Sequence, residues 1–367
     1  RTPCSFITAH VSNNKAMNIR KYLLYSSQLN TRLRTTLHAM SASSSTSNAL
    51  STVGERFRVG PNNKLKGVFG GSGSDLMNDA RPIQRIVELV GKPVQDIHVL
   101  YLGTATYDIE AFESRQTERF QELNCQVSAL KVALDDSVSL KEAEDLIDQA
   151  DVLVVGGGNT LYAVDRWTSL GLVPALRKAM ERGAVMTGGS AGAICWFDGG
   201  HSDSMDPDTY KDAMLSSFAD SSSTAKDETD VASSAEVKQW NYIRVPALGF
   251  LPGLICPHHD KVQSNGVLRA LDFDRILLQS PDELGIAIDH WAALVLNGES
   301  YEVLSLEGKP GSVPTNGGEE YVSDGAGTPG IWIKQVVDGK IQQRPCPPKG
   351  STADLLRKCT EKMINDE

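Results

Sequence analysis

The chain has 367 residues, of which 40% are hydrophobic, so it can bury the core of one large domain or two small ones. No apolar run reaches the roughly eighteen residues that a membrane-spanning helix needs. The formal charge is -10, yet residues 1–54 hold six basic and no acidic side chains, which leaves -16 on the rest. A body this acidic is a poor general binder of nucleic acid.

The first 60 residues are rich in Ser, Thr and Asn and lack a periodic apolar pattern. We expect a disordered or targeting tail there, either an organellar transit peptide or a segment outside the mature protein, with Met40 as the alternative start. Six scattered cysteines without a C-x-x-C pair indicate a reduced, intracellular protein, cytoplasmic or, with a transit peptide, organellar.

From Leu65 onward, short apolar runs alternate with amphipathic stretches of helical length. The expected strands cover residues 65–69, 97–102, 126–132, 151–155 and 184–186, and the expected helices end near 90, 123, 149, 167 and 182. Continuous apolar strands separated by helices predict a mostly parallel, doubly wound α/β sheet with both faces covered. In such a sheet, ligands bind beyond the carboxyl ends of the strands.

The remainder of the chain changes character twice. Residues 205–236 are rich in Ser and acidic residues and predict a mobile surface insertion. Two strong turn signals, Asn297-Gly298 and Asp338-Gly339, predict C-terminal β-hairpins, and a closing helix is expected from about Ser351. We therefore expect an α/β hydrolytic domain over residues 61–310 and an extension over 311–367 that packs on the same domain.

The most informative stretch is Gly188-Gly189-Ser190-Ala191-Gly192, which follows an apolar run and precedes another. It matches G-x-S-x-G, the nucleophile elbow, in which a sharp strand-to-helix turn lifts a serine hydroxyl above the sheet edge. The amide of Ala191 would then point toward an oxyanion formed on that serine. A glycine-rich turn with an incidental serine is the alternative on this pattern alone.

A serine nucleophile needs a histidine base, which a carboxylate commonly orients. His258 is the favoured base because Pro257 fixes the backbone before it at the end of an apolar strand. Other histidines in turn-like segments are His201 and His259, while two in or beside apolar strands are interpreted as packing residues, His98 and His290.

The carboxylate is less determined, because Asp203 competes with Asp198, Asp206 and Asp260. A zinc or manganese site is an alternative use of four residues, His201, Asp203, His258 and Asp260, although no H-x-x-H-type pair anchors it. The loop from Gly70 to Gly73 lacks the third glycine of a dinucleotide fingerprint, and no glycine loop is followed by G-K-[ST]. We expect no metal and no cofactor.

Four motifs in this order resemble the peptidase E family of serine exopeptidases, the α-aspartyl dipeptidases, over residues 65–296. They are Gly156-Gly157-Gly158-Asn159-Thr160, Ser190-Ala191-Gly192-Ala193, Gly200-His201-Ser202-Asp203-Ser204 and Cys256-Pro257-His258. The sequence departs from the family in its longer insertion after Asp203, in its additional N-terminal tail and C-terminal extension, and in His259, where an aromatic residue is expected.

The resemblance implies a class I glutamine-amidotransferase-like, flavodoxin-like fold and hydrolysis of dipeptides with N-terminal aspartate, without a metal. It implies a triad of Ser190, His258 and Asp203, and an oxyanion hole built from the amides of Gly157 or Gly158 with Ala191. We expect substrate contacts from Asn159 and from Arg269, with Lys261 as the alternative cation for an acidic side chain.

Two alternatives stay open at this stage. A cyanophycinase-like enzyme would use a similar serine to cut aspartate-based peptides, and a catalytically silent protein would use the glycine loops to bind an anion or peptide. As partners we expect a small peptide substrate and neither nucleic acid nor membrane, with a homodimer as the alternative to a monomer.

Overall fold

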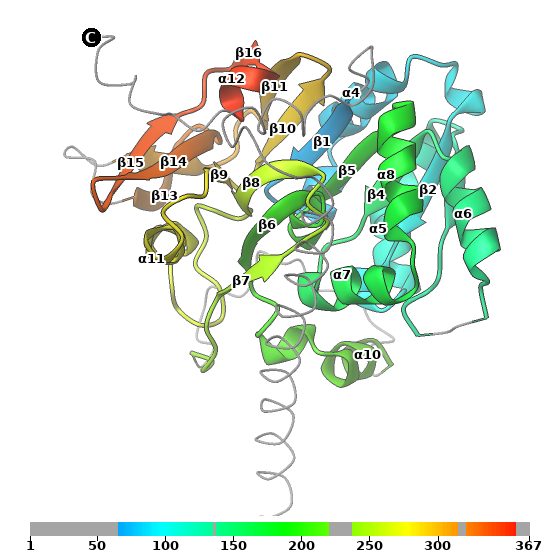
Figure 1. Ribbon diagram of the computed structural model, residues 1–367, viewed down its shortest axis with the longest axis horizontal. Helices are drawn as coiled ribbons and strands as arrows, with labels where there is room; N and C mark the ends of the chain where they lie inside the picture. Colours follow the sequence, from blue (N-terminus) through cyan, green and yellow to red (C-terminus); the bar gives the residue numbers. More distant parts are fainter. Residues whose placement is uncertain (1–64, 135–136, 220–236, 315–320, 357–367) are drawn as a thin grey trace, which may run out of the picture. The chain divides into compact units, whose positions relative to one another are not determined.

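The computed structural model describes residues 65–134, 137–219, 237–314 and 321–356, which all belong to one compact unit, Val53–Glu367. The tail expected over residues 1–60 lies outside the described residues. Across the described ranges, no helix is both long and apolar enough to cross a bilayer. Two large β-sheets, a small two-stranded sheet and the helices around them make up the described part of this unit (Figure 1).

The larger sheet has eight strands in the order β16-β11-β10-β1-β5-β4-β2-β3. Five of them are mutually parallel: β1 (Lys66–Gly70), β2 (His98–Leu102), β3 (Gln126–Ala129), β4 (Val152–Val155) and β5 (Val185–Gly189). Three antiparallel strands extend it beyond β1: β10 (Ala292–Asn297), β11 (Ser300–Ser305) and β16 (Lys349–Ser351).

Helices cover both faces of the parallel strands, with α4 and α5 on one side and α6 and α8 on the other (Figure 1). Alternate strand residues such as Val68 and Val99 pack against Ile83 of α4 and Phe120 of α5 in one core cluster. These helices are α4 (Ala80–Val90), α5 (Glu110–Glu122), α6 (Leu140–Gln149), α7 (Thr160–Ser169) and α8 (Val173–Arg182).

The ends of two helices follow directly from the sequence. Asp79 caps α4 by accepting a hydrogen bond from the Arg81 amide, and Gly91 ends the helix in the left-handed conformation. Ser139 and Glu142 form a reciprocal capping box at the start of α6. Each cap satisfies backbone groups that a helix end leaves without partners.

The smaller sheet has six strands in the order β15-β14-β9-β8-β6-β7. Its central strands are parallel, β6 (Phe197–Ser202), β8 (Leu251–Cys256) and β9 (Gly285–Ile288), and antiparallel strands flank them, β7 (Ile243–Pro246), β14 (Ile331–Val337) and β15 (Lys340–Pro345). Helix α11 (Arg269–Gln279) packs on it, with Phe273 and Leu277 against Leu254 and Cys256.

The mixed α/β architecture agrees with the sequence, but its strands form two sheets instead of one doubly wound sheet. The strands β9 and β10 are separated by only three residues, yet they belong to different sheets. The turn that carries Asp289, His290 and Trp291 therefore crosses from one sheet to the other. No local signal predicts such a crossing, because the pairing partner of a buried strand is set by distant parts of the chain.

Both predicted C-terminal hairpins are present, β10–β11 around Asn297-Gly298 and β14–β15 around Asp338-Gly339. Among the strands after residue 310, β14 pairs with β9 and β16 pairs with β11, so both large sheets are extended. Strands β12 (Gly311–Pro314) and β13 (Tyr321–Gly327) form a separate two-stranded sheet. The predicted closing helix is a short one, α12 (Thr352–Leu355), and residues 357–367 lie outside the described residues.

Part of the stretch expected as a mobile insertion has regular structure. Residues Lys211–Ala219 form α10, and the 3-10 turn before it, Pro207–Thr209, is fastened by hydrogen bonds from Tyr107 and Asn159 to Thr209. Residues 220–236 lie outside the described part of the chain.

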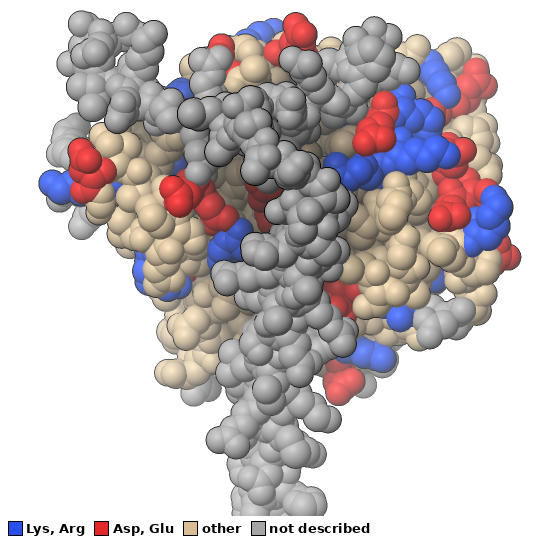
Figure 2. All heavy atoms as spheres, in the orientation of Figure 1, with Lys and Arg blue, Asp and Glu red and all other residues tan. Residues whose placement is uncertain are grey.

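Acidic and basic side chains are intermingled on the described part of the face shown in Figure 2. Among the described residues, Arg85 pairs with Glu302, whose atoms lie 2.8 Å apart, and Arg119 pairs with Glu122 at 2.7 Å. Pairs this exposed contribute little to stability.

The link from β5 to α9 (Ala191–Ile194) is the tightest turn around the sheet edge. A Cβ added at Gly192 would lie 2.1 Å from the carbonyl oxygen of Val155, at the end of β4. A Cβ added at Gly189 would lie 1.7 Å from the carbonyl oxygen of Ser72, after β1. Glycine at these positions lets three strand ends come into backbone contact.

Replacing Gly192 with alanine should therefore destabilise the fold by about 2 kcal/mol or more, because the added methyl group meets backbone that cannot rotate away. Urea unfolding followed by circular dichroism measures the loss. Gly330→Ala is the matched control, since the nearest atom to its added Cβ is 3.9 Å away. Equal unfolding midpoints for the two variants would contradict this account of the turn.

Candidate active site

Ser190 stands at the turn between β5 and α9 in a strained backbone conformation, with φ 55° and ψ -125°. A non-glycine residue adopts a positive φ there only when the surroundings enforce it. The Ser190 amide donates to the Gly70 carbonyl, 3.2 Å away, while the Ser190 hydroxyl makes no hydrogen bond within the described residues. The strain thus presents an uncommitted hydroxyl at the carboxyl end of β5.

His258 follows β8 and also has a positive φ, 49°. Its amide donates to the carbonyl of Gly71, 3.0 Å away. Ser190 and His258 come from different sheets, yet both are fastened to consecutive residues of the loop after β1. The two residues expected as nucleophile and base therefore lie at the same edge of the sheet.

The amides expected to form an oxyanion hole are free within the described part of the chain: those of Gly157, Gly158 and Ala191 make no hydrogen bond there. Gly157 lies directly beside the serine, because a Cβ added to it would be 3.5 Å from the Ser190 Cβ. Gly158 has φ 117° and packs against the backbone of Ala105. These amides are donors available next to the Ser190 hydroxyl.

The imidazole of His258 is hydrogen-bonded to a second histidine. The Nδ1 atoms of His258 and His290 lie 2.8 Å apart, and Nε2 of His290 lies 2.7 Å from Oδ2 of Asp75. Both rings are almost completely buried, with 6% and 3% of their residue surface exposed. Across the described residues, Nε2 of His258 has no hydrogen-bond partner.

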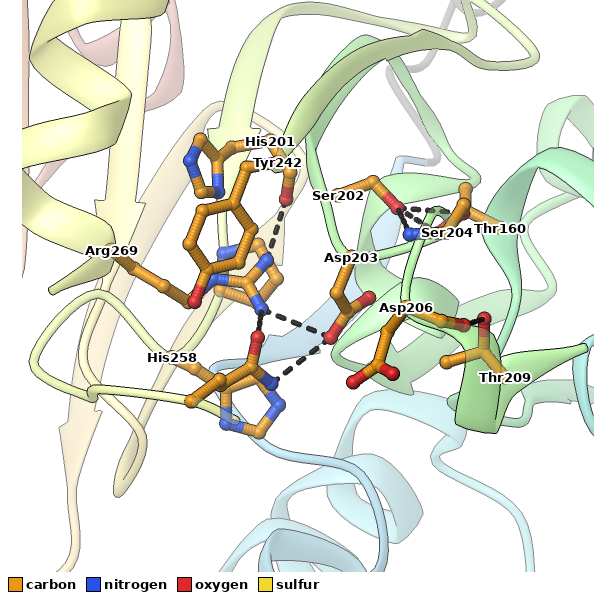
Figure 3. Close-up of polar contacts among 12 residues, drawn as sticks. Thr160, His201, Ser202, Asp203, Ser204, Asp206, Thr209, Tyr242, His258 and Arg269 are labelled. Carbon is orange, nitrogen blue, oxygen red and sulfur yellow. Dashed lines mark hydrogen bonds and ion pairs between the residues drawn. The ribbon is translucent and has the colours of Figure 1, made fainter. Parts of the chain in front are cut away.

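Asp203, the carboxylate expected to orient His258, makes its contacts elsewhere. Its Oδ2 accepts hydrogen bonds from Arg269 Nη1 at 3.2 Å and from Gln263 Nε2 at 3.0 Å (Figure 3). It makes no hydrogen bond to His258 in the described part of the chain. Asp203 pairs with the Arg269 guanidinium because a buried cation without a partner has a very high free-energy cost. This pairing is more favourable than a contact with the His258 imidazole.

Arg269, expected to contact the substrate, has 0% of its surface exposed. Its guanidinium also donates to Gln263 Oε1 at 3.0 Å and to the His201 carbonyl at 2.7 Å, and it lies 4.9 Å from the Tyr242 ring centre (Figure 3). Because Arg269 is fully buried and bonded to Asp203, its guanidinium is not exposed for direct contact with a substrate. Lys261 is more accessible, with 30% of its side chain exposed, and its amide donates to the His258 carbonyl at 2.9 Å.

Asn159, the other expected substrate contact, uses its side chain within the protein. Its Oδ1 caps α7 by accepting from the Tyr162 amide at 3.0 Å, and its Nδ2 donates to Ser204 and Thr209. The residue is fully buried. Its position at the end of the glycine loop fixes where α7 begins, and thereby fixes the loop.

The metal alternative has no support in the described residues, where no group of three or more His, Cys, Asp or Glu side chains could hold an ion. Nε2 of His201 pairs with Asp272 at 3.0 Å, and Asp260 accepts from the His290 amide at 2.7 Å. The four residues that the sequence offers as a metal site therefore make separate contacts instead of sharing one ion.

His290 and Asp75 were not candidates from the sequence. His290 is interpreted there as a packing residue because it lies between two apolar strands, and Asp75 attracts no notice two residues after a glycine loop. A signal was nonetheless present, since each follows the end of a strand, β9 or β1. Strand ends at one edge are where site residues gather in α/β proteins.

Burial lowers the pKa of His258 well below its ordinary value, and the neighbouring side chains of His290, Arg269 and Lys261 lower it further. The imidazole is therefore neutral, as a general base must be, at neutral pH and into mildly acidic solution.

The reactivity of Ser190 should accordingly persist into mildly acidic solution. We expect the rate of labelling by a fluorophosphonate to rise with pH through an inflection below about 6.5 and to be flat at neutral pH, because only neutral His258 accepts the proton. Labelling rates across a pH series measure it, with His98→Gln as a control at the opposite end of β2. An inflection at or above 6.5 would contradict the assignment.

Comparison with known proteins identifies the family of this chain. The model of peptidase family S51 matches residues 68–304, which include the serine, both histidines and Asp75. The uncharacterized peptidase YgaJ of Bacillus subtilis (strain 168) is 30% identical over 192 residues, 52% of this chain and 67% of the relative. A Trypanosoma brucei brucei protein named G2/mitotic-specific cyclin-1 is 30% identical over 324 residues, 82% of this chain and 90% of the relative.

Two solved structures are also similar. One is a Listeria monocytogenes EGD-e protein described as a peptidase E, with 15% identity and a TM-score of 0.44, covering 66% of this chain and 99% of that protein. The other is a peptidase from an acI-B1 Actinobacterium, with 16% identity and a TM-score of 0.47, covering 78% and 96%. The sequence match spans well over half of the chain. The chain therefore belongs to peptidase family S51, the family of peptidase E.

Proposed function

We propose that this protein is a serine exopeptidase that hydrolyses dipeptides with N-terminal aspartate through an acyl-enzyme. The observation that carries the proposal is the pair of anchors on the loop after β1: the strained Ser190 bonds to the Gly70 carbonyl and His258 bonds to the Gly71 carbonyl. They bring a free hydroxyl and a histidine with a free Nε2 to one edge of the molecule.

In the proposed reaction, Ser190 Oγ bonds to the peptide carbonyl carbon as its proton passes to Nε2 of His258. The carbonyl oxygen becomes an oxyanion, which accepts hydrogen bonds from the amides of Ala191 and of Gly157 or Gly158. The C–N bond then breaks, and the proton on His258 moves to the departing amine. Water then attacks the carbonyl carbon of the ester and gives its proton to His258. The bond from that carbon to Ser190 Oγ breaks, His258 returns the proton to Oγ, and the acid product leaves.

An acidic substrate side chain needs a cation in a protein whose net charge is negative. The positive charges of Lys261 and Arg269 both lie near enough to His258 to lower the pKa of its imidazole. We propose that Lys261 contacts the substrate carboxylate, since it is partly exposed, and that Arg269 strengthens the positive potential from behind Asp203.

We also propose that the parallel strands are a flavodoxin-like sheet of the kind found in class I glutamine amidotransferases. In space their order is β3-β2-β4-β5-β1. It becomes the flavodoxin order 2-1-3-4-5 when β1 is counted last. The topology supports a site beyond the carboxyl ends of β1, β4 and β5.

The activity itself is tested with an Asp-X and a Leu-X dipeptide. We expect the wild type to favour Asp-X and Ser190→Ala to lower kcat by about 10³-fold or more, because the nucleophile is lost. Ser300→Ala, at the exposed start of β11, is the control.

A third substrate, a β-linked aspartyl-arginine peptide, tests the cyanophycinase-like alternative. Turnover of this peptide alone would reject the dipeptidase proposal in favour of that enzyme. A wild-type protein that neither turns over any of the three nor reacts with a fluorophosphonate at Ser190 would indicate the catalytically silent binding protein.

Substrate charge recognition has its own test. Lys261→Gln should raise KM for Asp-X by about 10-fold while leaving Leu-X unchanged, since only the acidic substrate loses a partner. Arg269→Lys should also reduce Asp-X turnover, because a lysine cannot satisfy Asp203, Gln263 and the His201 carbonyl together. Lys92→Gln is the matched control, because Lys92 is an exposed lysine that pairs with Asp151 and has no proposed contact with the substrate. Unchanged Asp-X kinetics in both variants would reject this recognition.

A further inference from the structure

We propose that His290 and Asp75 are positioning residues for the His258 base, so that the residues act in the order Ser190–His258–His290–Asp75. The proposal rests on the proposed hydrolase function. It gives His290, together with Asp75, the role of orienting His258 that was expected of Asp203. Asp203 stays bonded to Arg269 and Gln263.

The argument begins with the proton on His258. To accept a proton from Ser190, its Nε2 must carry a lone pair, so its Nδ1 carries the hydrogen. Nδ1 lies 2.8 Å from Nδ1 of His290, which must then be the acceptor in that bond. A neutral His290 that accepts at Nδ1 carries its own hydrogen on Nε2.

Asp75 completes this assignment. Its carboxylate oxygen lies 2.7 Å from Nε2 of His290 and can only accept, so it favours the tautomer with hydrogen on Nε2. In the opposite tautomer of His290, the lone pair on Nε2 would face the carboxylate and the hydrogen would be on Nδ1. Nδ1 of His258 would then have to accept, and the hydrogen of His258 would move to Nε2, which must accept from Ser190. One carboxylate therefore selects the productive tautomer of two rings in succession.

The backbone that carries His290 is held firmly enough for this role. Its amide donates to Asp260 Oδ1 at 2.7 Å, and the preceding Asp289 accepts from His259 Nδ1 at 3.0 Å and from the amides of Ser312 and Gly330. All these groups are buried or nearly so. A ring whose backbone is fastened on both sides can hold a fixed hydrogen-bond direction.

The charged and titratable groups around the two rings come from several elements. His258 faces His290 from the sheet-crossing turn, Arg269 from α11 and Lys261 from its own loop. His290 faces Asp75, in the short helix α3 (Ser74–Met77), with Asp260 at its backbone, and its ring packs on Trp291, which Lys309 covers. Among the described residues, Asp75 is the carboxylate that accepts a hydrogen bond from the His290 ring, and His290 in turn contacts His258, so removal of Asp75 should be felt at His258.

The first experiment replaces the carboxylate. Asp75→Asn can present an amide donor to His290 and so permits the unproductive tautomer, and we expect kcat for Asp-X to fall by roughly 10²-fold with KM little changed. Asp79→Asn, on the same segment, is the matched control, because asparagine still caps α4. A kcat for Asp75→Asn within twofold of the Asp79→Asn control would overturn the proposal.

The second experiment restores a carboxylate at a different place. His290→Phe leaves Nδ1 of His258 without an acceptor and should lose activity, whereas His290→Glu can accept from His258 directly and should recover at least tenfold over His290→Phe. In His290→Glu the acid limb of the pH profile should move to higher pH, because a carboxylate stabilises the imidazolium of His258. A purely structural role for His290 would not move that limb.

Asp75→Asn combined with His290→Glu should be no slower than His290→Glu alone, since the new carboxylate makes Asp75 unnecessary. A folded His290→Glu as slow as His290→Phe, or a double variant slower than His290→Glu, would overturn the relay. Should His290→Phe fail to fold by circular dichroism, the kcat of Asp75→Asn and the pH limb of His290→Glu decide.

Failure of the underlying function gives a different result. A wild type that neither turns over substrate nor labels at Ser190 would remove the hydrolase itself. Normal turnover that is lost in Ser190→Ala but unaffected by Asp75→Asn would remove the relay alone.

Discussion

Two consecutive carbonyl groups, those of Gly70 and Gly71, hold the candidate site together. They receive the amides of Ser190 and His258, which arrive from two different sheets. Both residues have a positive φ, a conformation that a non-glycine residue keeps only when its surroundings enforce it. The hydrogen bonds to this loop, together with the glycine contacts at Gly189 and Gly192, provide that enforcement.

Many polar groups behind the site are buried and hydrogen-bonded to one another. Arg269 is matched by Asp203, Gln263 and the His201 carbonyl, and Asp289 by His259, Ser312 and Gly330. Burial works against ionisation of Asp289, but hydrogen bonds from His259 and Ser312 outweigh it and leave the pKa below its usual value. Networks of this kind are rigid, because every group that moved would leave a partner unsatisfied.

Local signals predicted much of this architecture. The apolar runs, the capping box at Ser139 and the turns at Asn297-Gly298 and Asp338-Gly339 all specify structure within a few residues of themselves, and the G-x-S-x-G turn places Ser190 for the same reason. The division into two sheets was not predictable, since it depends on which distant strands pair. For that reason the sequence could not reveal that His290 lies against His258, or that Arg269 holds Asp203.

Because the site residues come from two sheets, the site can form only late in folding. Ser190 belongs to the eight-stranded sheet and His258 to the six-stranded one, while His290 occupies the crossing between them. Neither sheet alone therefore carries both Ser190 and His258. Under the proposed function, a partly folded chain cannot turn over substrate until the two sheets have packed together.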